Sequence, residues 1–139
     1  MLRTCLAAAL VLIPGQLLAD GFLAAKPEKL PDMNLGLGDA GYGVSQKDYN
    51  LVTGKGYRLK ITNTGAKECA WIAPDFTASI WLRKVEVKKI EIKTSYLVEV
   101  EMEDEGEAEL FFVPIKPGEY IWRCRGLEEK GVTGKFIVK

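Results

Sequence analysis

Short runs of alternating apolar and polar residues fill the chain from about Asp48 to its end. In the run YRLKIT, Tyr57, Leu59 and Ile61 share one face of an extended strand. Turn-forming residues such as Asn63-Thr64-Gly65 separate the runs at short intervals. Roughly eight or nine short strands spaced in this way predict an all-β fold, an antiparallel Greek-key β-sandwich.

The same alternation predicts which side chains fill the core: Tyr57, Leu59, Ile61, Val98, Val100, Phe112, Tyr120, Trp122 and Phe136. The segment PDFTAS is compact enough for one helical turn. In EVEMEDEGEAEL, acids alternate with apolar residues, which is typical of the solvated face of a hairpin that turns at Asp104-Glu105-Gly106. These acids could instead attract a cation or a basic partner.

The N-terminus has the pattern of a secretory signal peptide. Arg3 precedes an apolar stretch from Cys5 to Leu18, and the small residue Ala19 precedes Asp20. About 14 apolar residues interrupted by Pro-Gly fall short of the roughly 20 that span a membrane. We therefore expect a signal peptide over residues 1–19, export to the periplasm, and no membrane span after cleavage.

Residues 20–47 form the next predicted unit, an extended N-terminal arm that precedes a domain over residues 48–139. Prolines and glycines are frequent between Asp20 and Ser45, and the apolar residues there are isolated. This composition predicts little regular structure in the arm.

Composition excludes several functions. The chain has 139 residues and 0 His, which excludes catalytic Ser-His-Asp and Cys-His pairs and imidazole-ligated metal sites. Lys and Arg number 19, and Asp and Glu also number 19, so no excess of positive charge favours nucleic acid. We expect neither catalytic residues nor enzyme activity. Loss of the signal peptide leaves Cys69 and Cys124 as the only thiols.

The string IKPGEYIWRC resembles the end of a cupredoxin, and the resemblance covers about residues 57–139. In that family, a Pro-Gly-x-Tyr turn leads a strand to a copper-binding Cys, here Cys124. The resemblance places Leu127 and Val132 where the loop His and Met would stand, and Glu68 or Cys69 near the earlier His. It therefore implies a cupredoxin-like sandwich that cannot build a blue-copper site.

The resemblance also implies that Cys69 and Cys124 lie on neighbouring strands, which leaves three states open. They form a disulfide, they remain free buried thiols, or they join Glu68 in a metal site for copper or iron of a type other than blue copper. The function expected is that of an exported cupredoxin-like binding or accessory protein, whose partner is another periplasmic protein beside a redox or metal-handling system. The alternative is a copper- or iron-binding electron-transfer protein with a Glu/Cys site, and no cofactor is assigned.

Overall fold

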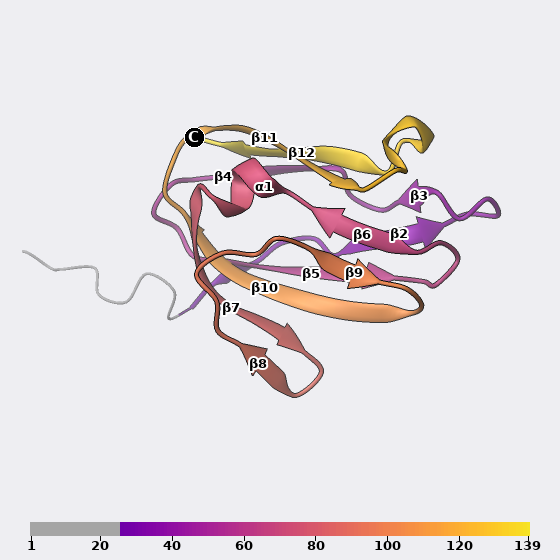
Figure 1. The fold of residues 1–139 in the computed structure, drawn as a ribbon. Coiled ribbons are helices and arrows are strands. Elements are labelled where there is room, and N and C mark those ends of the chain that lie inside the picture. The colour runs from indigo at the N-terminus through magenta and orange to yellow at the C-terminus, as the bar shows by residue number, and fades with distance from the viewer. Residues whose placement is uncertain (1–25) are drawn as a thin grey trace, which may run out of the picture.

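Two β-sheets stack on each other in the computed structural model, which describes residues 26–139 (Figure 1). The predicted signal peptide and the first residues of the arm lie outside the described residues. The first sheet contains β1 (Glu28–Lys29), β2 (Met33–Leu37), β3 (Gly43–Val44), β5 (Tyr57–Asn63), β7 (Ile80–Val87), β8 (Ile90–Ile92) and β10 (Gly106–Pro114). The second contains β4 (Asp48–Leu51), β6 (Cys69–Ile72), β9 (Val100–Met102), β11 (Gly118–Cys124) and β12 (Thr133–Val138).

The prediction of an all-β sandwich is confirmed. The strand order is β3-β2-β5-β10-β7-β8 in the first sheet, where β1 also pairs with β5, and β4-β12-β11-β6-β9 in the second. The only helices within residues 26–139 are α1 (Pro74–Thr77) and the 3₁₀ turn η1 (Glu128–Lys130). Neither has the length and apolar character that would let it cross a membrane.

Strand pairing is mixed rather than purely antiparallel, which corrects one detail of the prediction. Strands β1 and β2 run parallel to β5, and β4 runs parallel to β12. Parallel neighbours cannot be joined by tight turns, so these strands reach their places through long connections. The Greek-key connection of the strands stays a prediction.

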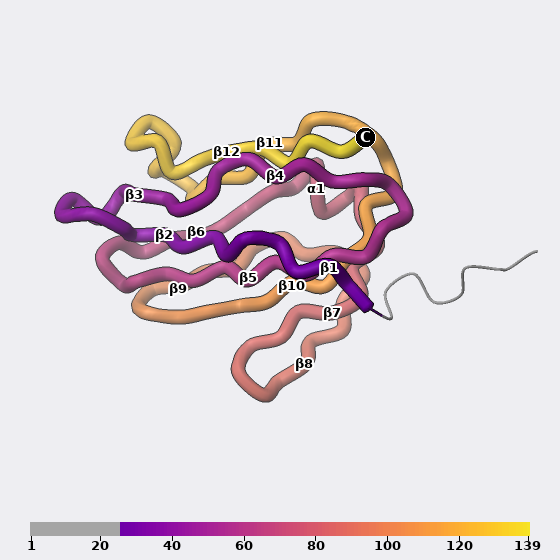
Figure 2. Tube along the Cα trace, turned by 180° about the vertical axis from the view of Figure 1, so that it is seen from behind, coloured from indigo at the N-terminus to yellow at the C-terminus, as the bar shows by residue number. Residues whose placement is uncertain are grey.

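The expectation of little regular structure between Asp20 and Ser45 is wrong for the described part of that segment. Strands β1, β2 and β3 form there, and Leu30, Met33 and Leu35 are buried in the core. Figure 2 shows this segment running along the sandwich beside β5. Strands β1 and β3 have two residues each, and β1 and β2 pair with β5 farther along the chain, so local alternation gave little signal.

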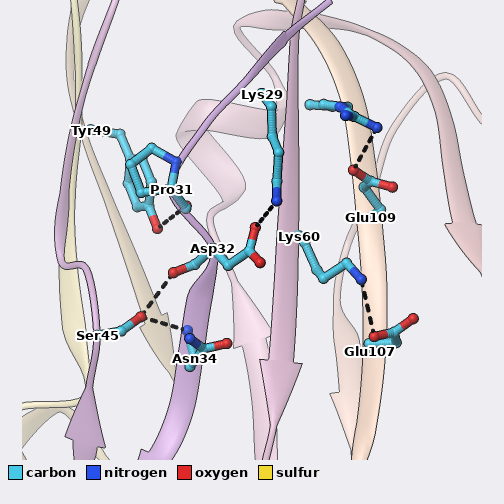
Figure 3. Close-up of polar contacts among 10 residues, drawn as sticks. Lys29, Pro31, Asp32, Asn34, Ser45, Tyr49, Lys60, Glu107 and Glu109 are labelled. Carbon is cyan, nitrogen blue, oxygen red and sulfur yellow. Dashed lines mark hydrogen bonds and ion pairs between the residues drawn. The ribbon is translucent and has the colours of Figure 1, made fainter.

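Side-chain hydrogen bonds fix this N-terminal segment in place (Figure 3). The hydroxyl of Ser45 donates to the Asp32 carbonyl at 2.8 Å and accepts from the Asn34 backbone N–H at 2.8 Å. The Tyr49 hydroxyl donates to the Pro31 carbonyl at 3.1 Å. These bonds link β2 to the approach to β4, and hence one sheet to the other.

The core contains most of the side chains that alternation predicted. The buried members are Tyr57, Leu59, Ile61, Phe112, Tyr120, Trp122 and Phe136. Helix α1 is the predicted helical turn, and its Phe76 stacks on Phe136 with ring centroids 3.9 Å apart.

Two predicted core residues lie at the edge of the sandwich. The side chain of Val98 is 67% exposed, so its predicted burial is wrong, and Val100 is only half-buried. Val98 belongs to the connection between β8 and β9, and β9 is the last strand of its sheet. The predicted hairpin around Asp104-Glu105-Gly106 is also wrong, because β9 pairs with β6 while β10 pairs with β5 and β7 in the other sheet.

We expect Gly134→Ala to destabilise the fold by about 1–3 kcal/mol, because an added methyl group would collide with backbone. A Cβ at Gly134 would overlap the Lys47 carbonyl, which accepts a 2.8 Å hydrogen bond from the Trp122 indole N–H. Urea denaturation measures the change. Gly106→Ala is the control, since its nearest neighbour would be Met102 Cγ at 3.8 Å, and equal effects of the two variants would contradict the prediction.

Candidate functional site

A disulfide bond joins Cys69 on β6 to Cys124 on β11. The two Cα atoms are 5.1 Å apart, within the range that a disulfide spans without backbone movement. Both cysteines are almost completely buried. Of the three states left open by the sequence, the structure has the disulfide.

Backbone hydrogen bonds close the loop that follows Cys124. The Leu127 N–H donates to the Cys124 carbonyl at 3.0 Å, and the Val132 N–H donates to the Leu127 carbonyl at 3.2 Å. The Cys124 N–H donates in turn to the Val132 carbonyl at 3.1 Å. Gly131, with φ of 83°, supplies the left-handed residue that ends η1 within this loop.

Hydrocarbon fills the positions where the family resemblance expects copper ligands. Val132 is buried, and Leu127 packs against the core while half-exposed. The donor set therefore does not fit a blue-copper centre: the Cys124 sulfur is bonded to Cys69, and the sequence contains 0 His.

Glu68 lies on the surface while its neighbour Cys69 is buried. Successive residues of an extended chain point to opposite sides, so the carboxylate and the sulfur atoms diverge. Within residues 26–139 no group of three His, Cys, Asp or Glu side chains is arranged to hold a metal ion. The metal site made of Glu68, Cys69 and Cys124 stays a prediction.

Glu68 borders a surface cavity of about 450 Å³ next to the disulfide-bearing strands. The cavity is lined by Lys67, Glu68, Ala70, Glu101, Arg125 and Leu127. Arg125 forms an ion pair with Glu99. The pKa of Glu101 is raised above its ordinary value, first by the charge of Glu99 and then by desolvation and the charges of Glu68 and Glu103. Like charges therefore crowd this part of the surface.

Asn63 is a structural residue of this end of the sandwich that the sequence interpretation missed. It is 1% exposed, and its amide nitrogen donates to the carbonyls of Lys67 at 2.9 Å, Met102 at 3.2 Å and Asp104 at 3.3 Å. These bonds tie the turn before β6 to the turn after β9. Asn63 follows Tyr57, Leu59 and Ile61 on the inward face of β5. A polar residue at an inward position was the sequence feature that could have identified it as a buried hydrogen-bonding residue.

No family model and no curated protein matches this chain. Solved structures do match, among them the McoA multicopper oxidase from the hyperthermophile Aquifex aeolicus, with a TM-score of 0.60, 10% identity, and coverage of 84% of this chain and 30% of that one. The copper nitrite reductase from Nitrosomonas europaea matches with a TM-score of 0.53, 13% identity, and coverage of 68% and 33%. A multicopper oxidase from Campylobacter jejuni matches with a TM-score of 0.53, 12% identity, and coverage of 82% and 30%.

These similarities define the class of fold. The chain has a cupredoxin-like fold, as the resemblance over about residues 57–139 indicated. It spans about a third of the length of each of these solved chains. At such low identity the similarity extends to the fold and not to the chemistry of those oxidases and reductases.

The disulfide should be present in the native protein and should contribute about 4 kcal/mol to its stability, from the loop entropy of a 55-residue separation. Thiol counting under denaturing conditions should find no free thiol in the mature chain. The double variant Cys69→Ser/Cys124→Ser should unfold at a much lower urea concentration. Two titratable thiols in oxidised native protein, or unchanged stability of the variant, would contradict this prediction.

The neighbouring carboxylates also lead to a prediction, which concerns the pKa of Glu101. Glu99→Gln should lower the pKa of Glu101 toward its ordinary value, because Glu99 is the largest cause of the raised pKa. Carboxyl ¹³C NMR titration measures it, with Glu119→Gln as a control, since Glu119 pairs with Lys135 instead. A raised pKa means that the folded chain binds this proton more tightly than the unfolded chain, so Glu101 destabilises the fold above that pKa and ceases to do so as the pH falls through it.

Proposed function

We propose that this chain is an exported cupredoxin-like accessory protein that binds another protein and does not carry a blue-copper centre. The observation that carries the proposal is the Cys69–Cys124 disulfide, which removes the one thiolate that the cupredoxin resemblance offers to copper. A disulfide sulfur lacks the negative charge that makes a thiolate a strong copper ligand.

Export to the periplasm is supported by two independent features. Residues 1–19 have the charge and hydrophobicity pattern of a signal peptide. Disulfides form and persist mainly in oxidising compartments, and Cys69 and Cys124 form one. We propose that the protein acts there beside a redox or metal-handling system, since its structural neighbours include copper oxidases and a copper nitrite reductase.

A binding role is favoured over catalysis by the side chains available. The sequence has 0 His, so no imidazole can serve as a general base or activate a nucleophile. The two thiols that could have acted as nucleophiles are joined in the core. The solved oxidases and reductase have chains about three times as long as the matched part, and their activities do not transfer to this one.

A second candidate function is that of a copper or iron protein in the reduced state. Reduction of the disulfide would release two thiols in the core, and Glu68 directly precedes one of them beside the 450 Å³ cavity. Convergence of the three groups would require Glu68 to turn inward. Thiolate and carboxylate ligands would then form a site without imidazole.

Copper titration of the protein purified from the periplasmic fraction tests the proposal. Its mass should correspond to a chain that begins at Asp20. Addition of Cu(II) to the oxidised protein should give no intense thiolate-to-copper absorption band and no stoichiometric bound copper. A visible band that disappears in Cys124→Ser would overturn the proposal.

The same titration after anaerobic reduction, with Cu(I) or Fe(II), distinguishes the second candidate. Stoichiometric metal that is lost in Glu68→Gln and in Cys69→Ser would establish the Glu/Cys site. Glu28→Gln is the control, because Glu28 lies on β1, in the other sheet.

A further inference from the structure

One side of the sandwich has an open edge in both sheets. Strand β8 ends the first sheet and β9 ends the second. The β7–β8 hairpin projects beyond the rest of the sandwich (Figures 1 and 2). A cavity of about 250 Å³ lies between the two edges, with Val87 and Lys88 of the hairpin on one side and Val100 and Met102 of β9 on the other.

Apolar side chains with the spacing of core residues stand uncovered at this edge. Ile90 and Ile92 pair with Val87 and Val85, and Val85 is buried in the core, yet Ile90 is 64% exposed and Ile92 is 45% exposed. On the other side, the 67% exposed Val98 continues the alternation of Val100 and Met102. Within residues 26–139, no element covers these side chains.

The backbone of β9 is available for pairing along its outer side. On its inner side, Val100, Glu101 and Met102 pair with Trp71, Ala70 and Cys69 of β6. In the described part of the chain, no strand pairs with its other side. An exposed strand edge of this kind presents unpaired N–H and C=O groups to an incoming extended segment.

Charge around β9 is strongly negative. The 250 Å³ cavity is lined by five acidic residues, Glu101, Glu103, Asp104, Glu105 and Glu107, and by one basic residue, Lys88. Repulsion between neighbouring carboxylates raises the pKa of Glu101. Glu101 lies on the outer face of the strand, whereas Val100 and Met102 lie on the inner face.

We propose that the β9 edge binds an extended segment of a partner protein in which apolar and basic residues alternate. The segment adds to β9 as a further strand, its apolar side chains cover Val98, Val100 and Ile90, and its basic side chains lie beside the outward carboxylates. This assignment rests on the proposed function, because it names the surface and the partner chemistry of the accessory role.

A second copy of this chain is a poorer occupant of the edge. Two β9 strands side by side would bring Glu99, Glu101 and Glu103 of each copy together. Strand β8 of a second copy would bring Glu91 together with Lys84 and Lys93, which are already ion-paired with it and so are not free to pair with the β9 carboxylates. Basic residues from a different sequence relieve the repulsion that pairing of two β9 strands would increase.

A synthetic peptide tests the proposal with the full mature chain. The probe is a capped seven-residue peptide that alternates Lys and Val, with Lys at both ends, titrated into ¹⁵N-labelled protein. We expect saturable binding with amide shift changes concentrated on Val98–Met102 and on β8. Binding should weaken as salt rises, because exposed charges are screened.

Three peptide controls separate strand addition from other kinds of attraction. A peptide of the same composition with its Lys and Val residues in separate blocks, and a peptide that alternates Glu and Val, should both bind much more weakly. N-methylation of the amides along one edge of the alternating peptide should abolish binding, whereas N-methylation along the other edge should leave it intact. Equal binding of the alternating and block peptides would overturn the proposal.

Protein variants locate the surface. Glu101→Lys should weaken binding of the Lys-Val peptide by about fivefold, the size expected when one exposed charge pair is reversed. Glu28→Lys, on the first sheet, should leave the affinity unchanged. Val98→Asn should weaken binding by about tenfold through loss of apolar burial without adding charge, while Ile121→Asn, on an exposed residue of β11, should not. Wild-type stability in urea would show that each variant is folded.

The outcomes separate this inference from the proposed function. If the protein binds neither the peptide nor copper, the proposed β9 binding surface is wrong and the proposed accessory role stands. If the protein binds the peptide and also forms a thiolate–copper centre, the β9 binding surface is supported and the proposed function without a blue-copper centre is wrong. Concentration-dependent dimers in sedimentation, with shift changes on β9, would identify a second copy as the occupant and overturn the proposal.

Discussion

The bond between Cys69 and Cys124 is the constraint on which the end of the sandwich around it depends. It joins β6 to β11, whose pairing in the sheet is short: Arg123 pairs with Ile72 and Cys124 with Trp71. Strand β9, at the edge of the second sheet, pairs with β6. The bond from β6 to the central strand β11 therefore also connects this edge to the centre of the sheet. The loop after Cys124 can then close through its own backbone hydrogen bonds with apolar Val132 inside.

Asn63 complements the disulfide by joining the two sheets. It ends β5 in the first sheet, while the carbonyls that it binds belong to the turn before β6, to the last residue of β9 and to the turn after β9. A buried amide without partners would be costly, and here its nitrogen is satisfied by backbone groups. The covalent bond and the amide together order the turns that surround Glu68.

The sequence predicted the features that depend on local alternation and on the C-terminal motif. The inward positions of β5 and β11, the turn at α1 and the closeness of the two cysteines all follow from residues near one another or from the cupredoxin resemblance. The strands of the N-terminal segment could not be found in this way, because β1 and β2 are stabilised by a parallel partner, β5, distant in the sequence. Val98 shows a different limit: alternation indicates which face a residue occupies, whereas its burial depends on whether a second layer extends far enough to cover it.

The uncovered edge is informative because, within residues 26–139, charged side chains rather than a covering segment protect it. Exposed edges are commonly blocked by charged side chains, bulges or a covering loop, which prevents uncontrolled pairing between copies. At β9 the carboxylates of Glu99, Glu101 and Glu103 oppose pairing with an identical strand, yet they leave Val98 and Val100 accessible. A barrier made of one sign of charge excludes strands of the same sign and admits those of the opposite sign. In the proposed interaction, the carboxylates that oppose pairing of two β9 strands are therefore also the groups that select a basic, alternating partner.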